Sequence, residues 1–284
     1  MDPNVKKESV FRSGAVAMID GLGVKGAWRG PGGKPDLRVL DTMREARRVT
    51  ENLSKRYVGE ALGRVFVELL GVEPTVDVVA ISDTIILTGY ATPIEGVNAT
   101  GTEEQIAFGV LDAVCLCVGY AMRYAAKMDR PMVYRGAVSY GDFLMDGHSV
   151  LGPAVDEAGE CMELADGGFV WLTPSAAKLS PSSFGPVWRT YAHNYRVPLK
   201  GGQAIDTVAM SPFIDVGTLS EERGLIRAGY EKAMQSPKID VTVKRQNTMR
   251  FLDHVAAADA KREGEEIVRE EADRKWRAEK EKSE

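Results

Sequence analysis

The hydrophobic pattern of the chain predicts two buried strands that each end at an acidic residue. Residues 15–19 (AVAMI) form a continuous apolar run, which stops at Asp20 and opens into a glycine-rich segment. A second apolar run, residues 76–81 (VDVVAI), leads into Ser82-Asp83 and continues as TIIL over 84–87. Short apolar runs bounded by turn residues are typical of buried strands. If the two strands are neighbours, Asp20 and Asp83 lie side by side.

Apolar residues at three- and four-residue spacing predict helices between and after these strands. The clearest start signal is Thr102 with Gln105 three residues later, which form a capping box for a helix that reaches about Met128. The remaining predicted helices are one from Pro35-Asp36 to about Tyr57, one from Glu60 to Leu70 that stops at Gly71, one from Gly152-Pro153 to Ala165, a short one at Thr173-Pro174, and helical structure from about Ser220 onward.

Further strands are expected in the second half of the chain. We predict a hairpin of residues 132–139 and 143–150 around a turn at Tyr140-Gly141-Asp142, a strand over 168–173, and a late hairpin of 195–200 and 207–212 around Gly201-Gly202. Because hairpins interrupt the helices, a purely parallel doubly wound sheet is disfavoured. The sequence predicts an α+β fold with a mixed, largely antiparallel sheet and helices packed on one face.

The C-terminal segment has a composition of its own. From Asp259 onward it is dense in Lys, Arg, Glu and Asp, and its large apolar residues are Ile267, Val268 and Trp276. Two interpretations remain open at this point. The segment is either a solvated terminal helix or a helix that binds a partner.

Composition narrows the class of partner. The formal net charge of −5 argues against broad binding of nucleic acid or of an anionic membrane surface. The first ten residues carry no apolar signal segment, and the longest apolar stretch, residues 106–122, is interrupted by Asp112 and is short for a bilayer. Cys115, Cys117 and Cys161 lack zinc-site spacing and are expected to be reduced thiols. We therefore expect a soluble cytoplasmic protein.

Residues 21–26 (GLGVKG) match the G-x-G-x-x-G pattern of dinucleotide-binding proteins, which raises the possibility of an oxidoreductase. That motif requires a helix that opens within the glycines and an acid at the end of the next strand. Here residues 28–33 (WRGPGG) follow, which are unsuited to a helix, and the next acids fall in a helical pattern. The dinucleotide interpretation is disfavoured.

Asp20 and Asp83 are either two unrelated acids at strand ends or a pair that binds a divalent cation. Mg²⁺ prefers one or two carboxylates together with substrate phosphates, which matches the ligands available here. The three histidines are scattered, which disfavours zinc, and no G-x-S-x-G segment is present to support acyl transfer.

Taken in order, five segments resemble the class III nucleotidyl cyclase domain over residues 10–215, which leaves 216–284 as a helical C-terminal extension. They are Asp20-x-x-Gly23, Ser82-Asp83, residues 135–141 (RGAVSYG), residues 152–155 (GPAV) and residues 197–201 (VPLKG). The RGAVSYG and VPLK segments most resemble the bacterial pyrimidine cyclases of Pycsar anti-phage defence. The resemblance implies a ferredoxin-like core, a homodimer with composite active sites, and residues 140–150 as the dimer arm.

The resemblance also assigns roles to single residues. It implies that Asp20 and Asp83, with the carbonyl of Gly21, bind two Mg²⁺ or Mn²⁺ ions. It implies that the amides of Leu22, Gly23, Val24 and Lys25 hold the β- and γ-phosphates, and that Lys200 contacts the triphosphate. The product would be a 3′,5′-cyclic nucleotide, a second messenger, released together with pyrophosphate.

This sequence departs from the purine cyclases at three positions. Their transition-state Asn and Arg fall at Asp156 and Glu160, and their adenine-reading Lys falls at Val79. Arg135 is a candidate for the missing cation. The loss of that lysine counts against ATP and favours a pyrimidine triphosphate, with UTP ahead of CTP on the resemblance alone, whereas Asp156 and Glu160 motivate an alternative. The alternative is a purine cyclase, or a degenerate cyclase fold that binds nucleotide without turnover.

Overall fold

The fold is built on one mixed β-sheet. The computed structural model describes residues 10–22, 34, 37–56, 66–97, 101–146, 149–180, 188–214, 217, 220–235 and 238–283. Its strands are β1 (Val10–Leu22), β2 (Val72–Ile81), β3 (Thr84–Pro93), β4 (Val133–Asp146), β5 (Ser149–Leu151), β6 (Val170–Leu172), β7 (Ala192–Pro198) and β8 (Ala204–Met210). They lie in the order β2-β3-β1-β4-β6-β8-β7, and β5 pairs with β4. Among these described strands only β4 and β6 run parallel.

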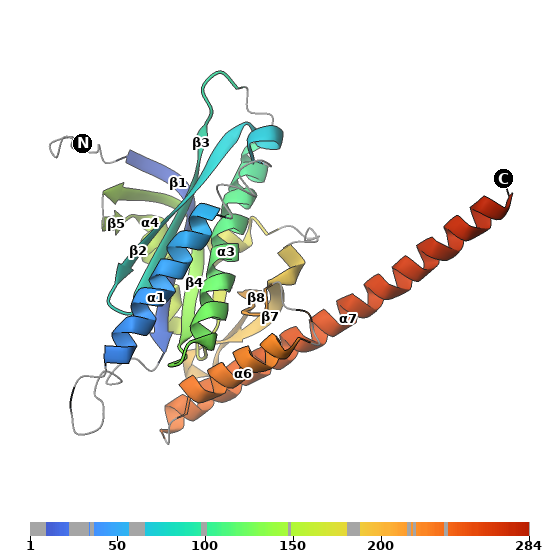
Figure 1. Cartoon of the computed structure of the whole chain (residues 1–284). Coiled ribbons are helices and arrows are strands. Elements are labelled where there is room, and N and C mark those ends of the chain that lie inside the picture. Colours follow the sequence, from blue (N-terminus) through green and yellow to red (C-terminus); the bar gives the residue numbers. More distant parts are fainter. Residues whose placement is uncertain are drawn as a thin grey trace.

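The first four strands form a ferredoxin-like unit. Helix α1 (Leu37–Leu53) connects β1 to β2, and helix α3 (Glu103–Lys127) connects β3 to β4, so that the strands lie in the order β4-β1-β3-β2. The predicted α+β fold with a largely antiparallel sheet is confirmed (Figure 1). Because β1 is antiparallel to both of its neighbours, it cannot be the first strand of the parallel sheet that a dinucleotide motif requires.

The helices agree with their local signals. Thr102 and Gln105 form both hydrogen bonds of the capping box at the start of α3. The other helices are α4 (Pro153–Leu164), α5 (Pro174–Ala177), α6 (Glu221–Ala233) and α7 (Ile239–Ser283). Of the helix expected over 60–70, residues 60–65 lie outside the described residues. Phe66–Leu70 form a π-helical turn, which Gly71 closes at a φ of 69°.

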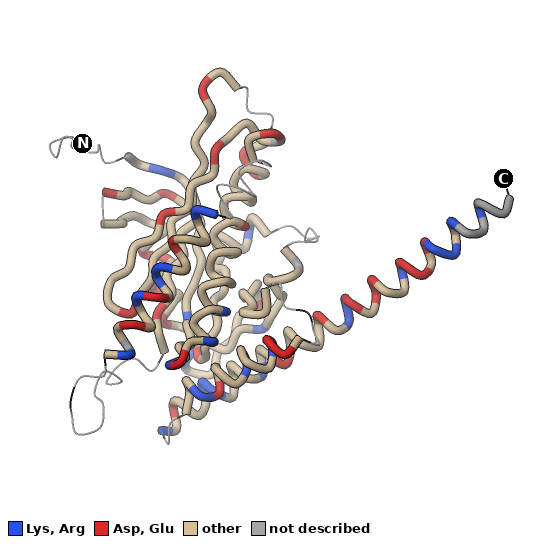
Figure 2. The backbone as a smooth tube through the Cα atoms, viewed as in Figure 1, with Lys and Arg blue, Asp and Glu red and all other residues tan. Residues whose placement is uncertain are grey.

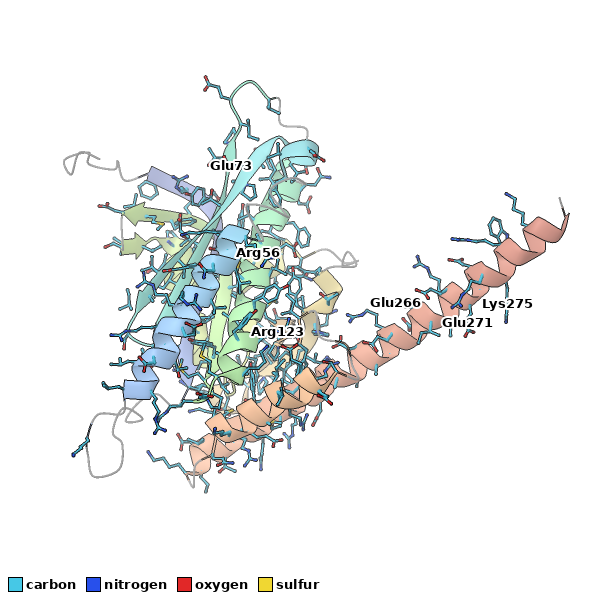
Figure 3. The ribbon with its side chains drawn as sticks, in the orientation of Figure 1. Arg56, Glu73, Arg123, Glu266, Glu271 and Lys275 are labelled. Atoms are coloured by element: carbon cyan, nitrogen blue, oxygen red, sulfur yellow. The ribbon has the colours of Figure 1, made fainter. Side chains whose placement is uncertain are left out.

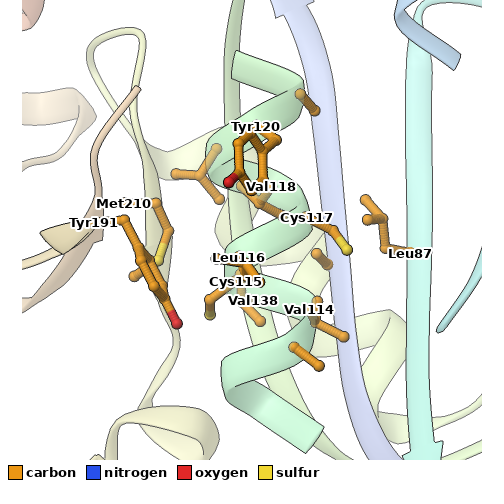
Figure 4. Packing of buried hydrophobic residues seen from close by; sticks show 14 of the residues in the cluster. Leu87, Val114, Cys115, Leu116, Cys117, Val118, Tyr120, Val138, Tyr191 and Met210 are labelled. Atoms are coloured by element: carbon orange, nitrogen blue, oxygen red, sulfur yellow. The ribbon is translucent and has the colours of Figure 1, made fainter. Parts of the chain in front are cut away.

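Helices cover both faces of the sheet, whereas we predicted helices on one face. Ala15, Ala17 and Ile19 of β1 pack against α3 in the main core, which Figure 4 shows around Val114, Leu116 and Val118. The alternate residue Val16 points to the other face, where it packs with Ala154 and Ala158 of α4. The expectation of one covered face was wrong because β1 is apolar on both faces, so each face needs a cover.

The predicted hairpin around Tyr140-Gly141-Asp142 was also wrong. Strand β4 runs without interruption through these residues, and Gly141 pairs with Gly14 of β1. The thirteen paired positions of β1 and β4 override the local turn preference of a Tyr-Gly-Asp segment. The chain reverses later, since Leu144–Asp146 pair with Ser149–Leu151. The late hairpin around Gly201-Gly202 is confirmed as β7 and β8.

Helix α3 is the central core helix. It is long and apolar enough to cross a membrane by length and composition alone, but 72% of its apolar window is buried inside the fold. Cys115 and Cys117 lie on it as buried free thiols, and Cys161 on α4 is a half-buried one. Burial raises the pKa of Cys117 to about 12, so this thiol stays protonated near neutral pH.

Helix α6 is tied to α3 by a charged cluster. Arg123, which Figure 3 labels, projects from α3. It donates to Glu222 at 2.8 Å and to the carbonyl oxygen of Ile214 at 2.8 Å. Lys127 also pairs with Glu222, and these donors lower the pKa of Glu222 to about 2. Ile226 and Tyr230 of α6 share a hydrophobic cluster with α3, the sheet and α7. The domain boundary between residues 10–215 and the C-terminal extension, 216–284, stays a prediction.

A carboxyl group in α3 makes stability depend on pH. Asp112 accepts a hydrogen bond from the hydroxyl of Tyr191, and burial raises its pKa from 3.8 to about 7. The folded protein therefore holds a proton that the unfolded chain releases, and this contribution to stability is lost as the pH rises from about 4 to 7. We expect Asp112→Asn to stabilise the fold by about 1–3 kcal/mol at pH 8 and to have little effect at pH 4.

The measurement is urea unfolding of both proteins at pH 4, 6 and 8. Asp146→Asn, at the exposed end of β4, is the matched control and should show no such pH trend. A difference between Asp112→Asn and the natural protein that is constant across the three pH values would contradict the proposed linkage.

Candidate functional site

The structure brings Asp20 and Asp83 together at one end of the sheet. Asp20 lies near the end of β1, and Asp83 lies in the two-residue turn that joins β2 to β3. Asp20 pairs with Thr84, and the amide of Gly21 donates to the carbonyl oxygen of Asp83 at 3.2 Å. Strand β3, and not β2, pairs with β1. Asp83 lies beside Asp20 because it belongs to the turn that leads into β3.

The turn that carries Asp83 has an unusual backbone. Ser82 adopts a φ of 59°, and it is the only residue other than glycine with a positive φ among the described residues. A left-handed conformation costs a non-glycine residue roughly 1–2 kcal/mol. Such conformations cluster at functional sites because the surrounding structure enforces them. Here the conformation at Ser82 closes the tight turn that places Asp83 beside β1.

Arg135 joins the acids from the other side of β1. It lies directly opposite Asp20 in the β1–β4 register, and its Nη2 is 3.3 Å from Oδ2 of Asp20. The two strands approach closely here, since a Cβ at Gly136 would lie 2.3 Å from the carbonyl oxygen of Met18. The Nε of Arg135 is buried and has no hydrogen-bond partner among the described residues. The N–H group at Nε of Arg135 therefore has no acceptor in the described part of the chain.

The pKa of Asp20 reflects this crowding. Burial raises it first, the charge of Asp83 raises it further, and Arg135 and the Thr84 hydroxyl lower it, with a net rise. Thr84 donates to Oδ1 of Asp20 at 3.3 Å. Two carboxylates that repel each other in a partly buried place are stabilised by a cation. Thr84 was not singled out from the sequence, although its place directly after Asp83 is a usable signal.

The donor set suits a hard divalent cation. Among the described residues, no group of three or more His, Cys, Asp or Glu side chains is placed to hold a metal ion. Two carboxylates and a backbone carbonyl fall short of a full protein cage, but Mg²⁺ commonly binds one or two carboxylates plus substrate phosphates. Asp20 and Asp83 fit that role, and the role itself stays a prediction.

The other predicted ligand-binding residues lie elsewhere or outside the described residues. Leu22 ends β1, and Gly23, Val24 and Lys25 are not among the described residues. Lys200 is exposed in the turn between β7 and β8, at the far edge of the sheet from Asp83. The structure therefore brings Asp20, Gly21, Asp83 and Arg135 together and leaves Lys200 apart from them within one chain.

Helix α4 covers the face of the sheet to which Asp20 belongs. Gly159 faces Met18 of β1, and Ala158 is buried against the sheet. Asp156 and Glu160 are exposed on the outer side of this helix. Val79, at the third departing position, is 5% exposed and packs with Val16 and Ile86 in the cluster under α4.

Comparisons with known proteins find likeness in fold only. No family model and no curated protein matches the chain. The catalytic core of a rhodopsin-guanylyl cyclase with converted specificity, in complex with ATPαS, is similar at 13% identity and a TM-score of 0.47, over 72% of this chain and 98% of that chain.

Two further solved structures show the same kind of likeness. The guanylyl cyclase Cya2 is similar at 12% identity and a TM-score of 0.39, over 71% of this chain and 92% of that chain. An adenylate/guanylate cyclase/hydrolase from Silicibacter pomeroyi is similar at 14% identity and a TM-score of 0.39, over 72% of this chain and 99% of that chain. Because these identities and scores are low, the likeness concerns the fold alone.

Proposed function

We propose that this protein is a nucleotidyl cyclase that converts a pyrimidine nucleoside triphosphate, UTP ahead of CTP, into the 3′,5′-cyclic monophosphate. The observation that carries the proposal is the cluster of Asp20, Asp83 and Arg135 at the end of β1. Two acids and one arginine, partly buried and next to the start of a glycine-rich segment, form a site for a metal-bound polyphosphate.

Asp20 and Asp83, with the carbonyl of Gly21, would hold Mg²⁺ or Mn²⁺. Two bound ions would supply Lewis-acid stabilisation of the attacking and leaving oxygens. The contribution of the chain is to fix the two carboxylates. Thr84 and Arg135 each hold one oxygen of Asp20, so its carboxylate plane cannot rotate freely.

The reaction is an intramolecular displacement. The ribose 3′-oxygen forms a bond to the α-phosphorus, the bond from that phosphorus to the bridging oxygen breaks, and pyrophosphate leaves with the electron pair. The proton of the 3′-hydroxyl passes to solvent. Arg135 would supply positive charge near the phosphates in place of the arginine that is absent at position 160, because its guanidinium lies beside Asp20.

Lys200 would reach the triphosphate from a second chain. Within one chain, the path from β1 to β7 crosses β4, β6 and β8. Four strand spacings of about 4.8 Å place β7 about 19 Å from β1, which is well beyond the reach of a lysine side chain. A site that contains both Asp20 and Lys200 therefore requires a homodimer in which each chain supplies part.

The base preference is supported by Val79. Its side chain is buried among apolar neighbours and cannot donate to a purine ring nitrogen. A site that lacks one buried hydrogen bond loses about 1–3 kcal/mol, or roughly ten- to a hundredfold. The order of UTP before CTP and the second-messenger role in anti-phage defence rest on the resemblance in sequence motifs, and the cytoplasmic location is proposed from the free thiols of the three cysteines.

The deciding experiment offers all four nucleoside triphosphates at equal concentration with Mn²⁺ and resolves the products by mass. We expect cyclic pyrimidine nucleotides and pyrophosphate, with ATP and GTP turned over at least about tenfold more slowly. Faster turnover of ATP or GTP than of both pyrimidines would overturn the base assignment while keeping the cyclase.

A second candidate is a purine cyclase, or a cyclase fold that binds nucleotide without turnover. The exposed acids Asp156 and Glu160 favour it, because they replace a donor and a cation by negative charges that repel a triphosphate. Nucleotide binding without pyrophosphate release from any of the four triphosphates would establish the non-catalytic alternative.

A further inference from the structure

The first half of helix α7 packs against α6 and the sheet, which are here called the body of the protein. Phe251, Leu252 and Val255 are fully buried. Asp259 is 2% exposed, is paired with the guanidinium of Arg223 from α6, and lies 3.2 Å from Arg262. The ring of His254 contacts the carbonyl oxygen of Asn194 in β7 at 2.9 Å. These contacts fix the direction in which the rest of the helix leaves the body.

The second half of α7, residues 263–283, is here called the projecting segment. Figure 1 shows it extending away from the sheet to the C-terminus. Every side chain from position 264 to 277 is exposed. Its own ion pairs are long and solvated, such as Arg274 with Glu270 at 4.0 Å. Because most helical stability in proteins comes from packing of one face, a helix this long without packing is suited to a partner.

One face of the projecting segment carries an apolar row. Gly264, Val268, Ala272 and Trp276 follow one another at four-residue spacing. Val268 is 67% exposed and Trp276 is 63% exposed. Four-residue rows are the ridges by which two helices most commonly pack. Val268 and Trp276 flank Ala272 at equal spacing, and the small side chain of Ala272 permits close approach between them.

The charge of the projecting segment changes sign along its length. Residues 263–273 hold six acids and one arginine, whereas residues 274–282 hold five bases and two acids. Figure 2 shows the acidic part next to the body and the basic part toward the C-terminus. A parallel pair of such helices would align like charges, whereas an antiparallel pair aligns the acidic half of each with the basic half of the other.

We propose that the projecting segment binds the projecting segment of a second copy of this chain in antiparallel orientation, with the two-fold axis at Ala272. This arrangement places Val268 of each chain against Trp276 of the other. On the two sides of the row it places Arg269 opposite Asp273 and Glu271 opposite Lys275, each pair twice by symmetry. Glu271 and Lys275 extend from the helix without contact to the body (Figure 3). The surface is isologous, as a two-fold contact requires.

This contact differs from the composite active site of the proposed cyclase. From Asp259 to Ala272 the helix rises about 20 Å at 1.5 Å per residue, so the two bodies are about 40 Å apart along the helices. Chains joined in this way do not share a site. The contact instead links one catalytic dimer to the next, and it needs no nucleotide.

Cysteine crosslinking in the full-length protein tests the orientation. On a Cys161→Ser background, one preparation carries Val268→Cys and another carries Trp276→Cys. We expect disulfide-linked dimers under mild oxidation in the mixture and not in either preparation alone, because positions 268 and 276 meet only between antiparallel chains. Crosslinking of each variant with itself would overturn the antiparallel arrangement, and absence of crosslinking in all samples would overturn the surface.

Charge reversal tests the pairing independently of activity. We expect Glu271→Lys to weaken self-association, measured by sedimentation at low salt, at least about tenfold. The double variant Glu271→Lys/Lys275→Glu should restore it, because each reversed charge again faces its opposite. Glu266→Lys, which reverses a charge at a position away from the row, is the matched control. A double variant that associates as weakly as the single one would overturn the proposed register.

Discussion

Asp20→Ala and Asp83→Ala should each abolish formation of cyclic nucleotide. Both carboxylates are held beside each other and beside Arg135, so loss of either one removes half of the proposed cation site. Removal of one group from a preorganised electrostatic site costs about a hundredfold or more in turnover. The measurement is pyrophosphate release with Mn²⁺, together with calorimetric titration of Mn²⁺ into the nucleotide-bound protein.

The fold should survive these substitutions. The charge of Asp83 raises the pKa of Asp20, so Asp83→Ala relieves a repulsion and should leave the unfolding midpoint unchanged or higher. Asp20→Ala leaves Arg135 without its carboxylate and is expected to cost some stability. Asp142→Ala, on the exposed side of β4, is the matched control for both. Activity of either site variant within tenfold of the natural protein would rule out the two-metal assignment.

Two inactive chains should restore activity when they are paired. In a dimer of one Asp20→Ala chain and one Lys200→Ala chain, one site carries both substitutions and the other carries neither. With random pairing of equal amounts, half of the dimers have one intact site, which gives about a quarter of the natural activity. Differently tagged, co-expressed chains allow the mixed dimer to be isolated, where half of the activity is expected.

The control for this experiment pairs Asp20→Ala with Asp83→Ala. Because both acids belong to the same end of one chain, each site of the mixed dimer keeps one defect and no activity should return. Equal recovery in both mixtures would indicate reassembly artefacts. No recovery in the Lys200 mixture would place Lys200 and Asp20 in one chain and contradict the composite site.

Features that depend on neighbouring residues were predictable from the sequence. The capping box at Thr102 and Gln105 and the stop at Gly71 are set by hydrogen bonds within a few residues, and both are confirmed. The position of each acid at the end of an apolar run was also predictable, whereas the adjacency of Asp20 and Asp83 was predicted only on the condition that their strands are neighbours. Strand β3 instead lies beside β1, and the β2–β3 turn brings Asp83 to Asp20.

Features that depend on distant pairing were not predictable. Asp20 and Arg135 are 115 positions apart, and they meet only because β1 and β4 pair in one register. The same pairing drew Gly141 into a strand although its local sequence favours a turn. The second covered face was missed for a related reason, since the apolar residues of α4 do not reveal which side of the sheet they bury.

The long register between β1 and β4 also limits how this chain can change in evolution. Side chains alternate between faces along a strand, so one inserted or deleted residue in β1 would turn Asp20 toward α3 and expose the alanines of the core. A substitution can alter one residue of the site and keep the register of β1. An insertion or deletion within β1 shifts that register and so changes the whole site. Relatives of this protein should therefore keep the spacing from the first residue of β1 to Asp20 while their loops vary in length.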